Sequence, residues 1–258
     1  MPEKVEEIYQ PNNQQKAKIE RGNTVAGVNE TIIKLLVSLD TDFANQNLLD
    51  VPCGEGEFIR ALKNYFPLAR VAGADLKPPR ENSGDFFSID ARRSFEFPAE
   101  KKFSVITCIS GVMEFDNTLS FFEQLKNSLS EQGLLIVTND NLLTVRDRLL
   151  YLFFGRTRQY KSFIGLSQPT WKQLSLQNLR RILWEADCEV REIHYAPVSH
   201  KEWIWLPLAL PLYFLQRLYL KTSEKSSELN ETLPLASLLS RHYVLVCQPV
   251  CRGEKPVI

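Results

Sequence analysis

Three acids follow short apolar runs at intervals that suit a nucleoside-binding site. Asp50 ends the run Leu48-Leu49-Asp50, and Asp75 ends the next run, 25 residues further on. Asp90 follows a third run, Phe86-Phe87-Ser88-Ile89. In an open α/β sheet, a carboxylate placed one strand–helix unit beyond the first turn can accept hydrogen bonds from both hydroxyls of a ribose. The spacing of Asp75 therefore predicts a ligand that contains a nucleoside.

A glycine-containing turn, Pro52-Cys53-Gly54-Glu55-Gly56, connects the first run to a segment with helical spacing of apolar residues. Such a turn lies at the carboxyl end of a strand, where the next helix presents free backbone N–H groups. Gly54 and Gly56 allow the backbone to approach a ligand where a Cβ would collide. A nicotinamide dinucleotide site is the main alternative, but its GxGxxG pattern requires a third glycine where this chain has Ile59. The pattern favours an adenosine over a dinucleotide.

Composition excludes several classes of protein. The chain has 258 residues, 44% of them hydrophobic, and its 31 basic and 31 acidic residues cancel, so there is no electrostatic footprint for nucleic acid. The charged N-terminus lacks the apolar core of a signal peptide. The cysteines show neither a CxxC pair nor zinc-ligand spacing, which predicts reduced thiols in a cytoplasmic protein and no metal site. They are Cys53, Cys108, Cys188, Cys247 and Cys251.

The apolar runs alternate with helical patterns, which predicts a parallel, doubly wound sheet with right-handed crossovers. Asn29 or Thr31 is expected to cap the first helix, and Gln132-Gly133 to end the helix over 117–130. Expected strands after the first are 70–75, 86–89, 103–109, 134–138, 189–195 and 243–247. No regular helix is expected between the last two strands, which suggests an antiparallel edge. We expect one domain, 1–258, with an N-terminal arm (1–28) and helical insertions at 139–168 and 196–240.

These motifs together resemble class I S-adenosylmethionine-dependent methyltransferases, within the small bacterial methyltransferase-domain proteins, including those of glycan and cell-envelope biosynthesis. The segments that carry the resemblance are LLDVPCGEGEFIRAL, VAGADL, FFSIDARR, ITCISGVMEF and EQGLLIVTNDN, in family order. The resemblance implies a Rossmann-like seven-stranded sheet, an enzyme that transfers methyl groups, and S-adenosylmethionine as cofactor. It covers about residues 45 to 140, with weaker similarity over 175–195.

The resemblance also implies roles for particular residues. Asp50 is expected near the amino group of the methionine moiety, Asp75 on the ribose, and Asp90 on the adenine. Arg21, in KIERGNT, is expected to reach the methionine carboxylate. Further cofactor residues implied by the same motifs are Pro52, Cys53, Gly54, Gly56, Leu76, Ala91, Ile109, Ser110 and Gly111.

The catalytic step is less well defined by the sequence. Many relatives have an acid followed by histidine after the fourth strand, whereas this chain has Glu114-Phe115. A cofactor-binding interaction protein without catalysis is therefore a second interpretation. Candidates for a general base are Glu114, Asp140 and His194, each of which also has an ordinary structural interpretation. His200 and His242 have no motif around them.

Two regions outside the common sheet are expected to define the methyl acceptor. The first, 139–168, is apolar and also basic; its guanidinium groups could hold a phosphate or carboxylate, or form a solvated helix face. These are Arg146, Arg148, Arg156 and Arg158. The region predicts a small or lipid-linked acceptor, with a sugar hydroxyl or a carboxylate as the methylated group.

The second region, 203–220, reads WIWLPLALPLYFLQRLYL and is apolar all round. Its uninterrupted apolar stretch is shorter than the ~20 residues that span a bilayer. A soluble chain must bury such a patch, so a lid or a homodimer interface is the first interpretation. Its tryptophans, tyrosines and flanking cations also suit a membrane-surface anchor, which would make the protein membrane-associated. The polar stretch 222–232 is expected to be a loop.

Overall fold

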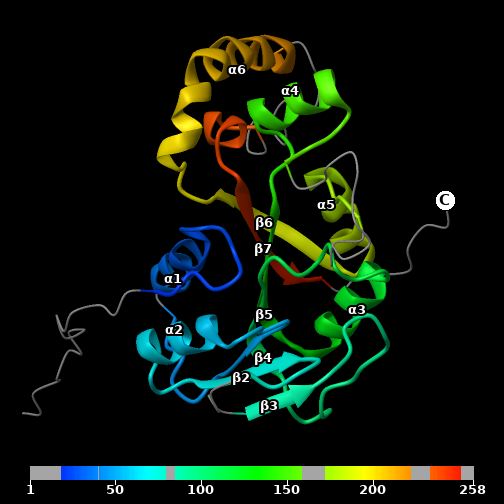
Figure 1. Cartoon of the computed structure of the whole chain (residues 1–258). Coiled ribbons are helices and arrows are strands. Elements are labelled where there is room, and N and C mark those ends of the chain that lie inside the picture. The colour runs from blue at the N-terminus through cyan, green and yellow to red at the C-terminus, as the bar shows by residue number, and fades with distance from the viewer. Residues whose placement is uncertain (1–18, 40, 80–84, 159–171, 222–232, 251–258) are drawn as a thin grey trace, which may run out of the picture.

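The computed structural model describes residues 19–39, 41–79, 85–158, 172–221 and 233–250. A seven-stranded sheet in the order β3-β2-β1-β4-β5-β7-β6 forms its centre (Figure 1). The strands are β1 (Asn47–Asp50), β2 (Arg70–Asp75), β3 (Asp85–Ser88), β4 (Phe103–Cys108), β5 (Leu129–Asp140), β6 (Cys188–Tyr195) and β7 (His242–Pro249). Neighbouring strands from β3 to β5 are parallel, whereas β7 is antiparallel to both β5 and β6.

Helices cover both faces of the sheet, because successive side chains of a strand point to opposite faces. Leu48 packs in one apolar cluster with residues of α1 (Val28–Ser38) and α2 (Glu57–Tyr65). The adjacent Leu49 packs in a second cluster, with residues of α3 (Thr118–Ser128) and α5 (Leu176–Glu185). The arrangement is a three-layer sandwich in which α1 and α2 lie on one side of the sheet and α3 and α5 on the other (Figure 1).

The two insertions form a helical cap beyond the carboxyl end of β5 (Figure 1). The cap consists of α4 (Val145–Phe154), the 3-10 turns η1 (His200–Trp205) and η2 (Leu235–Leu238), and α6 (Leu206–Lys221), which contains Pro211. These elements share a small apolar core of their own, made of Val145, Ala209, Leu238 and Leu239. None of the helices within the described residues is long and apolar enough to cross a membrane.

The predicted fold class is confirmed, with helices after β5 and between β6 and β7. Residues 1–18 of the predicted arm, 159–168 of the first predicted insertion and the predicted loop 222–232 lie outside the described residues. The antiparallel strand β7 lies inside the sheet, between β5 and the edge strand β6. Two predicted helix boundaries are wrong. Gly27, in the left-handed conformation, precedes α1 in place of the expected asparagine or threonine cap. Gln132 and Gly133 lie within β5, whose pairing with β4 shifts register there; a Cβ on Gly133 would lie 3.0 Å from the Phe103 carbonyl oxygen.

Gly73 provides a test of how tightly β2 packs beneath the glycine turn. A Cβ at this position would lie 2.6 Å from Ile59 Cδ1 and 2.9 Å from Cys53 Sγ. We expect Gly73→Ala to lower the free energy of unfolding by about 1–3 kcal/mol, because overpacking shifts side chains and backbone. Urea unfolding measures the change. Gly155→Asn is the control, since Gly155 has φ 60° with open space around it and asparagine tolerates that conformation; equal losses in both variants would contradict the close packing.

Candidate functional site

A cavity of about 440 Å³ opens at the carboxyl ends of β1, β2 and β4. This volume suits a ligand of the size of a nucleoside derivative. The cavity lies where the glycine turn, the ends of these strands and the segment before α1 meet. Its wall consists of Arg21, Gly22, Asn23, Thr24, Asn29, Asp50, Val51, Pro52, Cys53, Gly54, Glu57, Phe58, Ala74, Asp75, Leu76, Ile89, Asp90, Ala91, Arg92, Ile109, Ser110, Gly111, Glu114 and Phe115.

The structure brings the predicted cofactor residues together in this wall, except Gly56, which lies behind the turn as the N-cap of α2 with φ 82°. Among the candidate bases, Glu114 lines the cavity, and Asp140 and His194 do not. His194 lies on the edge strand β6, where its Nε2 is 2.7 Å from Glu192. Burial and the charge of Asp75 raise the pKa of Glu114 above its ordinary value.

Backbone hydrogen bonds fix the glycine turn against the sheet. The Val51 amide donates to the Thr107 carbonyl (2.9 Å), and the Cys53 amide donates to the Ala74 carbonyl (3.0 Å). Gly54 has φ 53°, and an added Cβ would meet nothing within 4 Å, so its backbone faces open space. Pro52 packs so closely on Gly111 that a Cβ there would lie 2.6 Å from the proline ring. The turn is therefore rigid and leaves backbone exposed to the cavity.

Asp75 lies beside this turn at the end of β2. One carboxylate oxygen accepts a hydrogen bond from the Gly54 amide (2.9 Å), and the other accepts from the Leu76 amide (2.6 Å). A carboxylate has about four acceptor positions, so both oxygens keep lone pairs for a ligand. Asp75 thus links the turn to β2 and presents a fixed pair of acceptors to the cavity.

Asp50 and Asn29 form a second group of acceptors, deeper in the wall. Asp50 is buried and accepts a hydrogen bond from the Thr107 hydroxyl (2.7 Å). Burial raises its pKa to about 7, the nearby charges of Asp75 and Glu57 add to that rise, and the Thr107 hydrogen bond opposes it. The buried Asn29 amide nitrogen donates to the Glu20 carbonyl, while Asn29 Oδ1 has no hydrogen-bond partner among the described residues. A carboxylate, together with an amide oxygen that has no partner in the described parts of the chain, suits a ligand with several N–H groups.

Asp90 is held in place by an arginine that the sequence motifs did not single out. The Arg92 guanidinium donates to both carboxylate oxygens of Asp90, at 2.9 and 3.0 Å, and lowers the pKa of that carboxyl. Other cavity residues missed at the sequence level are Thr24, Asn29 and Phe58. Thr24 lies in the same KIERGNT segment as Arg21 but was not singled out, and Asn29, within α1, was expected only as a helix cap.

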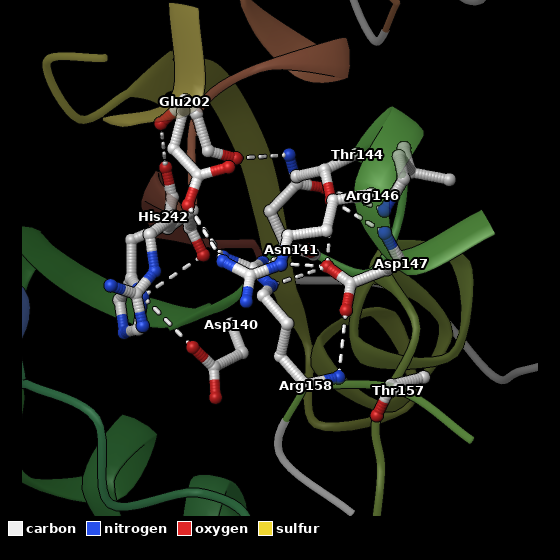
Figure 2. Close-up of polar contacts among 12 residues, drawn as sticks. Asp140, Asn141, Thr144, Arg146, Asp147, Thr157, Arg158, Glu202 and His242 are labelled. Atoms are coloured by element: carbon white, nitrogen blue, oxygen red, sulfur yellow. Dashed lines mark hydrogen bonds and ion pairs between the residues drawn. The ribbon is translucent and has the colours of Figure 1, made fainter. Parts of the chain in front are cut away.

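The basic residues after β5 are used mainly inside the protein (Figure 2). The Arg158 guanidinium lies 2.6 Å from the buried Asp147 carboxylate and 3.9 Å from the Glu202 carboxylate. Arg146 lies 3.3 Å from Glu202, and Arg148 Nε donates to the Leu143 carbonyl (2.8 Å). These contacts tie α4 to η1 and to the segment that follows α4. Three of the four arginines thus have partners within the protein, and their role in holding a phosphate or carboxylate of a ligand stays a prediction.

Comparison with known proteins defines the class. A family model described as a methyltransferase domain matches residues 25–193, so the chain belongs to this family. It is a class I methyltransferase that uses S-adenosylmethionine as cofactor, and this membership decides against a nicotinamide oxidoreductase.

Solved structures agree with the fold. The YcgJ protein of Bacillus subtilis has a TM-score of 0.52 at 15% identity, with 87% of this chain and 100% of that chain covered. A methyltransferase of Archaeoglobus fulgidus described as dependent on S-adenosylmethionine has a TM-score of 0.51 at 13% identity, covering 85% and 94%. An O-methyltransferase from a Brevibacillus brevis multienzyme, in complex with S-adenosyl-L-homocysteine, has a TM-score of 0.50 at 15% identity, covering 84% and 71%.

One curated relative matches over a short stretch. The malonyl-[acyl-carrier protein] O-methyltransferase of Hahella chejuensis is 41% identical over 54 residues, which is 21% of this chain. The match spans only 19% of the length of that relative.

Proposed function

We propose that the cavity binds S-adenosylmethionine and that the protein methylates an oxygen of a small or lipid-linked acceptor. The observation that carries the donor assignment is the pairing of Asp75 with the glycine turn: fixed acceptors for two ribose hydroxyls lie beside exposed backbone. In this proposal Asp90 and Ala91 flank the adenine; both line the cavity, as do Ile109, Ser110 and Gly111 on the side next to β4.

The residues present fit the cofactor. Its methionine moiety carries an ammonium group. The Asp50 carboxylate and Asn29 Oδ1, which no described residue hydrogen-bonds, supply acceptors for such a cation. Arg21 lies in the same wall and is a suitable partner for the methionine carboxylate. The open space above Gly54 leaves room for the ligand along the turn.

When bound, the cofactor supplies an electrophilic methyl group. The chain's residues then contribute by holding the acceptor in line with that group and by excluding water, which together can supply much of the rate acceleration. Phe58 and Phe115 are buried apolar members of the wall and limit the access of water to it. The match to a relative named as an O-methyltransferase supports an oxygen as the methylated atom.

The cap supports a lipid-linked acceptor. Consecutive apolar side chains at the end of α4 are exposed, with Phe153 at 69% and Phe154 at 65%. We call the exposed apolar side chains of α4, η1 and α6 the membrane face: Tyr151, Leu152, Phe153, Phe154, Trp203, Ile204, Leu208, Leu210, Phe214, Leu215, Leu218 and Tyr219. Within α4 and α6 the only acid is Asp147, which is buried against Arg158. An apolar face without exposed acid fits the surface of an anionic bilayer better than a second copy of itself.

We further propose that the protein works in the cytoplasm against the inner surface of a membrane. The four cysteines in the described residues are buried free thiols, as a reducing compartment favours.

A methyl-transfer assay tests the acceptor class. Lipid-linked sugar precursors extracted from bacterial membranes are incubated with the protein and S-adenosylmethionine labelled in the methyl group. We expect label in the lipid-soluble fraction and S-adenosylhomocysteine in equal amount. Label that appears only in water-soluble small molecules would contradict a lipid-linked acceptor while leaving the methyltransferase activity intact.

Flotation with vesicles tests the membrane face. We expect the protein to float with vesicles that contain phosphatidylglycerol, and the double variant Phe153→Ser/Phe154→Ser to bind at least about tenfold less, since a buried phenylalanine contributes roughly 1.5–3 kcal/mol. Leu68→Ser, at an exposed apolar position far from the cap, is the control. Equal flotation of both variants would contradict the assignment of this face. If the wild type is a dimer and the double variant is a monomer, the face is a homodimer interface instead.

A further inference from the structure

Four polar side chains form a continuous chain of contacts that starts in the cavity wall: two hydrogen bonds, followed by a close approach of an imidazole nitrogen to a carboxylate. Thr24 Oγ1 lies 2.8 Å from Ser110 Oγ, and both residues line the cavity. Ser110 Oγ lies 3.0 Å from Nε2 of His242, whose Nδ1 lies 3.0 Å from the Asp140 carboxylate. The four residues come from the segment before α1, the exit of β4, the first residue of β7 and the last residue of β5.

The surroundings of His242 determine the direction of this chain. Its Nδ1 faces two acceptors, the Asp140 carboxylate and the Arg241 carbonyl oxygen at 3.1 Å, so Nδ1 carries the proton. In the neutral ring Nε2 is then an acceptor, and the Ser110 hydroxyl donates to it. Because Ser110 has one proton, Thr24 must donate to Ser110. Both hydroxyl hydrogen bonds therefore point from the cavity toward His242.

The structure holds Ser110 in a conformation that a serine rarely adopts. Its φ is 58°, in the left-handed region, and its amide donates to the buried Thr138 hydroxyl at 3.0 Å. Non-glycine residues in this region cost free energy and cluster at functional sites, because the fold must over-determine them.

His242 is 4% exposed and Asp140 is 7% exposed, and Asp140 Oδ2 has no hydrogen-bond partner within the described parts of the chain. Figure 2 shows the Asp140 carboxylate and the His242 ring facing each other.

We propose that Thr24, Ser110, His242 and Asp140 form a proton relay that makes the acceptor a hydroxyl rather than a carboxylate; this rests on the proposed methyltransferase function of the same cavity. Ser110 contacts the acceptor as the catalytic residue, and His242 and Asp140 act through it as positioning residues. A carboxylate acceptor is already ionised and has no proton to lose. A hydroxyl acceptor must lose one, and a buried relay that ends on an imidazole can receive it.

The proton balance is complete within the chain. The acceptor oxygen forms its bond to the methyl carbon with one of its own lone pairs, and the electrons of the broken bond remain on the donor's sulfur. The acceptor's proton passes to Ser110 Oγ as the Ser110 proton moves to His242 Nε2. The Asp140 carboxylate then faces an imidazolium at 3.0 Å and stabilises its charge. Release of that proton to water after the reaction restores the relay.

Nitrogen NMR of the imidazole tests the relay without any acceptor. The chain has three histidines, so the background variant His194→Gln/His200→Gln leaves His242 as a single signal. Neither replaced side chain lines the cavity. We expect the Nδ1–H tautomer with an unprotonated Nε2 at pH 8. The Nε2–H tautomer would overturn the proposal, because Ser110 could then not donate to the ring.

Methyl transfer to two matched probes tests the acceptor class in the same background. Octyl β-glucoside offers hydroxyls and octanoate offers a carboxylate of similar chain length. We expect methylation of the glucoside, with His242→Gln lowering kcat by about 100-fold or more while KM and the affinity for S-adenosylhomocysteine change less than about twofold. Methylation of octanoate alone, or an unchanged kcat in His242→Gln, would overturn the relay.

The two proposals fail in different ways. A protein that binds no S-adenosylhomocysteine contradicts the proposed cofactor site, whatever the imidazole tautomer. A protein that binds it and carries the Nε2–H tautomer contradicts the relay alone. If neither probe is methylated, the imidazole tautomer alone decides on the relay: Nδ1–H supports it and Nε2–H overturns it. Glu114→Gln completes the comparison. If kcat falls more in Glu114→Gln than in His242→Gln, Glu114 and not the relay accepts the proton of the acceptor hydroxyl.

Discussion

Replacing Asp75 with alanine is expected to weaken the binding of S-adenosylmethionine by at least about 100-fold. Both oxygens of the carboxylate already accept backbone hydrogen bonds, from Gly54 and Leu76, so its position is fixed before the ligand arrives. Hydrogen bonds to a charged group contribute about 1.5–3 kcal/mol each, and the variant loses two from the ribose. A loss of about 1.4 kcal/mol is tenfold in affinity. Isothermal titration calorimetry with S-adenosylhomocysteine measures the change.

Two further variants separate the ligand contact from the support of the turn. Asp75→Asn keeps one acceptor oxygen and is expected to bind with intermediate affinity. Glu131→Ala, on the exposed start of β5 away from the cavity, should bind like the wild type. An affinity in Asp75→Ala equal to that in Glu131→Ala would show that the ribose lies elsewhere.

Replacing Asp50 with asparagine is expected to have opposite effects on binding and on stability. Burial raises the pKa of Asp50 from 3.8 to about 7, so between these values the folded protein holds a proton that the unfolded chain releases. The wild type therefore loses stability as pH rises from about 4 to 7, and above pH 7 it carries the full cost of a buried carboxylate. The variant Asp50→Asn cannot ionise, and its side-chain oxygen can still accept the hydrogen bond from the Thr107 hydroxyl.

Urea unfolding at pH 5 and pH 8 measures the stability effect. We expect Asp50→Asn to be more stable than the wild type at pH 8 and close to it at pH 5, both without ligand. The exposed Asp85 is the control, because its contact with Lys101 lowers the pKa of that carboxyl, so Asp85→Asn should give a small destabilisation at pH 8. A variant at position 50 that is less stable than the wild type at pH 8 would contradict the buried, costly carboxylate.

The same substitution should reduce cofactor affinity strongly, because the ammonium group loses its counter-charge. In the wild type, affinity should fall as pH drops below about 7, since a protonated Asp50 must ionise before it can pair with the ligand. Calorimetry across pH 5.5–8.5 measures this dependence, and a flat profile would separate Asp50 from the ammonium group.

Local sequence patterns were sufficient to predict that the end of the first strand, the glycine turn and Asp75 lie around one cavity. The first strand, the glycine turn and Asp75 lie within one strand–helix unit, so their spacing along the chain reflects their spacing in space. Ile59 in place of a third glycine was enough to favour an adenosine over a dinucleotide, and the structure packs Ile59 Cδ1 where a Cβ on Gly73 would lie. These assignments depend on neighbours in sequence, which is why they could be predicted.

The other side of the cavity depends on contacts between distant segments. His242 has no motif around it, and it meets Asp140 only because β7 inserts antiparallel between β5 and β6 with these two residues in register. Thr24 reaches Ser110 across 86 positions of sequence. Likewise, the sequence near Arg146 and Arg158 does not reveal their partner. Glu202, which pairs with both, lies in the other insertion. Contacts between residues so far apart in sequence leave no local pattern from which they could be predicted.

Calorimetric titration of the intact protein with S-adenosylmethionine, and separately with NAD, tests the central claim most directly. We expect one site for S-adenosylmethionine, weakened by at least about 100-fold in Asp75→Ala, and no heat of binding for NAD. Tight binding of NAD without a response to S-adenosylmethionine would contradict it.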